Sequence, residues 1–138
     1  MKPVRQFPKS PGAYALLIDL PVRARLSIAT LKQPVLAAGR YVYCGSARGP
    51  GGLAARLGRH LRRDKKLHWH MDHLTAVGPV LDVCCLEDGR ECEMVRCLVQ
   101  VPGVTMPVAG FGASDCRRCF AHLLKVPSEF ALSSCWFT

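Results

Sequence analysis

The chain has 138 residues, of which 49% are hydrophobic, so it can bury one apolar core. Lys and Arg number 19 against 10 Asp and Glu, and the formal net charge of +9 favours a polyanionic partner. Nucleic acid fits best, although anionic membranes and acidic proteins would also respond to this charge. No apolar run approaches the roughly 20 residues of a membrane span, and the N-terminus lacks the apolar region of a secretory signal. We therefore expect a cytoplasmic protein with no membrane partner, whose 8 cysteines are thiols.

The first half of the chain predicts three strands and a helix. The proline-rich residues 1–11 form an extended lead-in, 13–20 an apolar strand, 25–31 the return arm of a hairpin, and 40–44 a strand rich in Tyr and Val. A helix is expected over 53–63, where apolar and basic side chains recur at about 100° per residue on separate stripes. These stripes are Leu53, Leu57 and Leu61, then Arg56, Arg59 and Arg63, with His60 between them.

The second half adds two helices, a strand, a short segment of strand or helical turn, a loop and a tail. In chain order we expect a short helix over 67–77, a buried strand over 80–86, a turn at Asp88-Gly89, a helix over 91–101, a loop over 102–119, a short strand or helical turn over 121–126, and a tail over 127–138. The inward positions of the later helix are Cys92, Val95, Leu98 and Val99. No linker divides the chain, so residues 1–138 form a single α+β domain, a small and mainly antiparallel central sheet flanked by helices.

Several blocks of this sequence resemble the GIY-YIG endonuclease superfamily. Gly12-Ala13-Tyr14 and Tyr43-Cys44-Gly45 correspond to its two triplets, and Arg56 follows on a helix, with an acid on a later helix. The blocks YVYCGSA, RLGRHLRRDKKLHWHMDHL, Glu91-Cys92 and GFGASDC followed by HLL are similar to a small stand-alone prokaryotic branch of uncharacterised members. The resemblance covers roughly residues 11–125 and implies the hydrolysis of phosphodiester bonds.

The resemblance also implies a role for each residue of the site. Tyr14 would act as the base or position the attacking water, with Tyr43 as its partner. Arg56 would bind the phosphate, for which a planar guanidinium is well suited. His60 follows Arg56 by one helical turn and would assist proton transfer. Without the resemblance, the tyrosines would be interpreted as core residues and the arginines as a solvated helix face.

Two kinds of metal site are conceivable. By resemblance Glu91 would hold one Mg²⁺ or Mn²⁺ ion, with Glu93 as the alternative, since the two side chains point to different sides of a helix. Both glutamates would also suit the positive end of a helix dipole. A structural zinc could involve Cys116, Cys119 and His122, where a cluster of buried thiols is the competing interpretation. Within residues 68–73, a hydrogen bond between a histidine and Asp72 is expected to order the segment.

The basic side chains provide candidates for binding nucleic acid, with DNA favoured over RNA. They are Arg48, Arg59, Arg63, Lys65 and Lys66. The glycine-rich residues 45–52 lead into a helix, so their backbone could contact a phosphate or form a plain turn. Two other functions stay open: a module of the same fold that binds nucleic acid without cutting it, and an interaction protein stabilised by zinc.

Overall fold

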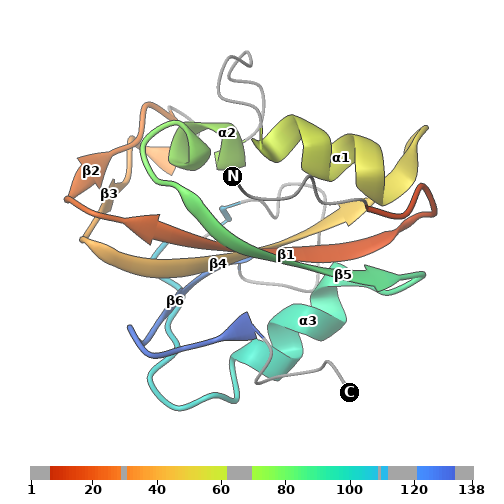
Figure 1. The fold of residues 1–138 in the computed structure, drawn as a ribbon. Helices are drawn as coiled ribbons and strands as arrows, with labels where there is room; N and C mark the ends of the chain where they lie inside the picture. The colour runs from red at the N-terminus through yellow and green to blue at the C-terminus, as the bar shows by residue number, and fades with distance from the viewer. Residues whose placement is uncertain (1–6, 29–30, 62–69, 109, 112–120, 133–138) are drawn as a thin grey trace.

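The computed structural model describes residues 7–28, 31–61, 70–108, 110–111 and 121–132. Its elements in chain order are β1 (Gly12–Leu20), β2 (Ala24–Arg25), β3 (Val35–Leu36), β4 (Gly39–Ala47), α1 (Gly52–Leu61), α2 (His70–Thr75), β5 (Val80–Glu87), α3 (Glu91–Leu98) and β6 (Leu123–Val126). This confirms the predicted α+β fold with an antiparallel sheet flanked by helices (Figure 1).

The main sheet has four strands in the order β5-β1-β4-β6, and each neighbouring pair is antiparallel. Side chains alternate along a strand, so β1 contributes to two cores. Tyr14, Leu16 and Ile18 enter a core with Leu53 and Leu57 of α1. Ala13, Ala15 and Leu17 enter a second core with Met94, Val95 and Leu98 of α3. Accordingly, α1 and α2 cover one face of the sheet and α3 covers the other (Figure 1).

One end of the sheet collects the first turns of two helices. Gly12 pairs with Ala47 on one side and with Glu87 on the other, so the start of β1 lies between the ends of β4 and β5. The helix α1 begins shortly after β4 ends, and α3 begins shortly after β5 ends. The tyrosine of the first triplet and the N-termini of α1 and α3 therefore lie at the same end of the sheet.

The predicted return arm over 25–31 is wrong. Both edges of β1 are occupied, one by β4 and the other by β5, so a further hairpin arm has no edge to pair with. In the described part of this segment only Arg25 lies in a strand, and it belongs to β2, which pairs with β3 in a separate small ribbon. Leu26 and Ile28 still bury their side chains in the core beneath α1. Their alternating apolar pattern thus reflects burial without strand pairing.

Several element boundaries and facings also differ from the expectation. The strand β4 continues to Ala47 rather than ending near Cys44. Leu61 was placed on the apolar stripe of its helix and Val99 was expected to face inward, yet they are 43% and 45% exposed. Leu61 is the last residue of α1 and Val99 is the C-cap of α3, so both lie where their helix ends. Met94, which the predicted inward face of α3 omitted, is buried.

Candidate functional site

Two tyrosines and a histidine form a compact cluster on the face of the sheet that α1 covers. The hydroxyl of Tyr14 lies 2.6 Å from Nε2 of His60, at hydrogen-bonding distance. The ring centroids of Tyr14 and Tyr43 are 6.2 Å apart, and that of His60 lies 5.3 Å and 6.0 Å from them. Residues distant in sequence are thus brought together by the pairing of β1 with β4 and by the packing of α1.

The glycine of the second triplet makes room for the tyrosine of the first. Tyr14 on β1 is paired with Gly45 on β4, while Tyr43 is paired with Leu16. A Cβ atom at position 45 would overlap the outer end of the Tyr14 ring. The Tyr14 phenol can therefore lie across β4 and reach His60 only because residue 45 has no side chain.

The cluster keeps both phenols protonated at neutral pH. Burial raises the pKa of Tyr14 well above its ordinary value, and the neighbouring Tyr43 raises it further, while the charge of Arg56 and a hydrogen bond from it lower it. Burial likewise raises the pKa of Tyr43 to about 12, against the opposing charge of Arg56. Arg56 therefore lies close enough to both phenols for its charge to influence them.

The residues of the cluster differ in their exposure to solvent. Tyr14 is 0% exposed and His60 2%, whereas Tyr43 and Arg56 are partly exposed. The expectation that Tyr14 itself contacts the attacking water does not agree with this burial. Of the two tyrosines, Tyr43 is the less completely buried, and Tyr14 lies between it and His60 in the sequence of contacts.

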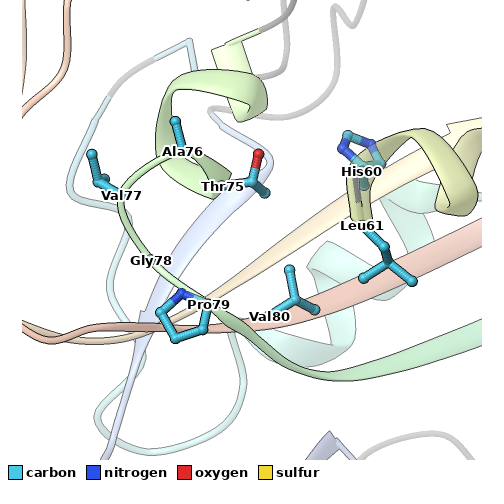
Figure 2. Close-up of a pocket in the computed structure, with 8 residues that line it drawn as sticks. All are labelled: His60, Leu61, Thr75, Ala76, Val77, Gly78, Pro79 and Val80. Atoms are coloured by element: carbon cyan, nitrogen blue, oxygen red, sulfur yellow. The ribbon is translucent and has the colours of Figure 1, made fainter. Parts of the chain in front are cut away.

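Two hollows adjoin the cluster. A small one of about 190 Å³ lies at the start of α1, where Arg56 and Arg59 meet the turn that follows β4. A larger one of about 430 Å³ lies between the end of α1, the turn after α2 and the start of β5 (Figure 2). Most of the side chains in its wall are apolar, and the hydroxyl of Thr75 in that wall donates to the backbone of its own helix. His60 lines the larger hollow and also contacts Tyr14, so it links this hollow to the tyrosines.

Arg59 has a structural partner. Its two Nη atoms donate to the carboxylate of Asp72 at 2.6 Å and 2.9 Å, which joins α1 to α2. Asp72 is completely buried, and this bidentate pair compensates its charge. A histidine was expected to bond to Asp72, and one candidate, His68, lies outside the described residues. The partner of Asp72 that the structure describes is Arg59.

Of the other predicted nucleic-acid contacts, the structure describes Arg48. Arg48 is exposed, and its guanidinium donates to the carbonyl of Gly89 at 2.5 Å and lies 4.0 Å from Asp88. Arg63, Lys65 and Lys66 lie outside the described residues. Among the described candidates, only Arg59 shares the hollow of Arg56 at the start of α1.

The phosphate cradle considered for residues 45–52 is not what the structure forms. The amides of the first turn of α1 are already bonded within the protein, as Leu53 donates to Ser10 and Ala54 to Pro8. The amides of Gly52 and Ala55 donate to nearby carbonyls of the same turn. The lead-in therefore caps this helix, and those four donors are not available to an anion.

Glu91 is the better placed of the two glutamates. Its charge is one of the smaller influences that raise the pKa of Tyr43, after burial, and its side chain is half-buried. Glu93 is exposed. Among the described residues, donor atoms of Glu91, Cys92 and His122 lie within 4.8 Å of one another and could hold a metal ion. Cys116 and Cys119, the other predicted zinc ligands, lie outside the described residues.

The donor atoms beside Glu91 restrict which ion this position suits. A carboxylate next to substrate phosphates is a common ligand for Mg²⁺ or Mn²⁺, which prefer oxygen. Sulfur and imidazole nitrogen select zinc and similar transition metals instead. The group as a whole therefore fits zinc better than magnesium. The sequence alone did not single out Cys92 as a candidate ligand, because only the approach of His122 to the start of α3 reveals it.

The chain belongs to the protein family described as a domain of unknown function, DUF123, which matches residues 13–137. No curated protein and no solved structure matches it. The family match spans both tyrosines, α1 and the start of α3, so the cluster lies within the part of the chain that defines the family. In the described part of the chain, every helix is too short or too polar to cross a membrane.

Proposed function

We propose that this protein is a GIY-YIG-type endonuclease that hydrolyses phosphodiester bonds in nucleic acid, DNA rather than RNA. The observation that carries the proposal is the cluster of Tyr14, Tyr43 and His60 with Arg56 acting on both phenols. The net charge of +9 supports a polyanionic substrate. The hollow beside Arg56 is open to a phosphate group, which a guanidinium binds well.

In the proposed reaction the two phenols carry a proton inward from water. Tyr43, the partly exposed phenol, orients the water and accepts its proton while passing its own to Tyr14. Tyr14 passes its proton to Nε2 of His60, which lies 2.6 Å away. The hydroxide attacks phosphorus, the bond to the leaving oxygen breaks, and solvent protonates that oxygen. Because both phenols are neutral at physiological pH, His60 is the proton acceptor in this scheme.

Arg56 and Glu91 complete the proposed site. Arg56 stabilises the extra negative charge of the pentavalent phosphorus, and such a preorganised donor typically contributes about 100-fold or more to rate. Glu91 would hold a divalent ion, which the resemblance implies is Mg²⁺ or Mn²⁺ and which would neutralise charge on the phosphate. Mg²⁺ and Mn²⁺ should be tested because the resemblance implies them. Zn²⁺ should be tested as well, because the side chains next to Glu91 favour it.

One observation favours a second function, the binding of nucleic acid without cleavage. Tyr14 and His60 are buried against each other, and α3, which carries Glu91, covers the opposite face of the sheet from α1. On this alternative, the cluster is a polar element of the core that orders β1, β4 and α1. The exposed basic side chains would then account for binding by themselves.

A nicking assay on supercoiled DNA with each ion separates the two functions. We expect Arg56→Ala and Tyr43→Phe to lower the nicking rate about 100-fold or more, with DNA affinity changed only a few-fold. Tyr41→Phe is the matched control, since Tyr41 lies on the same strand and donates instead to the carbonyl of Ala37. Normal nicking by Arg56→Ala would overturn the site. Binding without nicking by the wild-type protein would favour the second function.

A further inference from the structure

A group of metal-binding side chains lies where the start of α3 meets the segment before β6. Glu91 and Cys92 are the first two residues of α3, directly after a tight turn in which Asp88 has φ +57°. His122 immediately precedes β6. One donor atom from each of the three lies within 4.8 Å of the other two. The fold therefore brings together a carboxylate, a thiol and an imidazole from two distant parts of the chain.

The backbone holds His122 in place from two sides. Its amide donates to the carbonyl of Phe111 at 2.8 Å, and its carbonyl accepts from the amide of Cys44 at 2.9 Å. Cys92 is a thiol and not part of a disulfide. The segment that carries His122 is thus fixed by the backbone, and Cys92 is held by α3.

A second observation points independently to a ligand at this place. His122 is only 4% exposed, and its Nε2 atom has no hydrogen-bond partner among the residues that the structure describes. A buried ring nitrogen left without a partner costs free energy, and native proteins rarely leave one so. A metal ion bound by the imidazole would remove that cost.

We propose that Glu91, Cys92 and His122 bind one Zn²⁺ ion. Thiolate, imidazole and carboxylate are the three ligand types that zinc uses in proteins, whereas magnesium and calcium do not select thiolate. In a tetrahedral zinc site the donor atoms are about 3.5 Å apart, which small rotations from the observed separations would provide. Three protein ligands leave a fourth position for water, as in sites where zinc takes part in chemistry.

This zinc site shares Glu91 with the proposed nuclease, but it does not depend on nuclease activity. Zinc binding is measured on the protein alone, without nucleic acid, so either proposal can fail while the other stands. If both hold, zinc is the ion that Glu91 holds, and Mg²⁺ is not required for nicking.

The test is the metal content of the full chain, purified without chelators from zinc-supplemented medium. We expect one zinc per chain in the wild type and at least a tenfold weaker affinity in Cys92→Ser and His122→Ala. The matched controls are Cys97→Ser and Glu93→Gln, which change an exposed thiol and an exposed acid on the same helix and should keep the zinc. Circular dichroism will show whether each variant is folded.

Replacing zinc with Co²⁺ gives a readout specific to the ligands. A thiolate ligand produces an intense sulfur-to-cobalt absorption band, which we expect in the wild type and Cys97→Ser and not in Cys92→Ser. Serine is nearly the same size as cysteine, so Cys92→Ser should keep the fold. A loss of zinc in this variant would therefore not be due to misfolding. Wild-type protein without zinc would overturn the proposal. So would zinc that survives Cys92→Ser and His122→Ala, or that is lost only in Cys116→Ser and Cys119→Ser.

Discussion

Single glycines decide where the phenols of this protein can lie. Gly45 faces Tyr14 across the β1–β4 pair, and the outer end of the Tyr14 ring occupies the space where a side chain at position 45 would be. The two triplets that resemble GIY-YIG are thus physically coupled, because the glycine of one accommodates the tyrosine of the other. Gly58, by contrast, is exposed in α1, and a Cβ there would meet nothing within 4 Å.

We predict opposite effects on stability from the same substitution at these two glycines. Gly45→Ala should lower the free energy of unfolding by about 1–3 kcal/mol, because the buried Tyr14 ring must move away from the new methyl group. Gly58→Ala should raise it by about 0.5–1 kcal/mol, because alanine loses less conformational entropy in a helix. Urea unfolding measures both.

The outcome for Gly45→Ala also bears on the hydrogen bond of Tyr14. If the methyl group moves the phenol, the contact between Tyr14 and His60 is lost, and any nicking activity should fall together with stability. An alanine at position 45 that leaves stability unchanged would show that Tyr14 does not lie across β4.

Among the elements, α1 and α2 are joined by one ion pair. Arg59 donates through both Nη atoms to Asp72, whose side chain is fully buried, while that of Arg59 is 25% exposed. Replacing Arg59 alone would leave the Asp72 carboxylate in the interior without this partner. The loss of stability would then come mainly from the buried, unpaired charge of Asp72, and less from the loss of the ion pair itself.

We predict that Arg59→Met lowers the free energy of unfolding by roughly 3–5 kcal/mol. The double variant Arg59→Met with Asp72→Leu should recover most of this loss, since no buried charge then remains. Arg96→Met, an exposed arginine on α3, is the control and should change stability by no more than about 0.5 kcal/mol. Stability of the double variant no better than that of Arg59→Met would contradict this account of the cost.

The elements also show what the sequence could predict. The apolar run of β1, the two stripes of α1 and the turn at Asp88-Gly89 each carry a local signal, and these elements were placed within a few residues. The small ribbon of β2 and β3 had no such signal. The alternating residues Leu26 and Ile28, which follow β2, mimic a hairpin arm, and only the occupation of both edges of β1 excludes one.

The candidate site was predictable to the same extent. Tyr14, Tyr43, Arg56 and His60 were chosen by motif; the register of β1 and β4 brings the tyrosines together, and the packing of α1 adds the other two. The Arg59–Asp72 pair and the approach of His122 to Cys92 depend on how helices and loops pack. Residue spacing along the chain contains no information of that kind, so these contacts were missed.

For the whole molecule, the three tyrosines should make stability fall at alkaline pH. Burial raises the pKa of Tyr14, Tyr41 and Tyr43, that of Tyr43 to about 12, whereas a tyrosine in an unfolded chain has a pKa near 10. Between about pH 10 and 12 the unfolded chain therefore binds fewer protons than the folded one. By linkage, the free energy of unfolding decreases as pH rises through this range, and these phenols contribute no pH dependence below it.

We predict that the protein loses roughly 2 kcal/mol of stability through Tyr43 by pH 12, which urea unfolding between pH 9 and 11.5 will follow in part. The Tyr43→Phe variant should lack the part of this pH dependence that comes from Tyr43. Lysines titrate equally in the wild type and the variant, so the difference between their stability curves isolates the contribution of Tyr43. Phenolate absorbance gives a direct check, because it should rise near pH 10 in urea and only at higher pH in the folded protein. Coincident titrations in the two states would mean that the tyrosines are solvated in the folded chain, and the buried cluster would then be wrong.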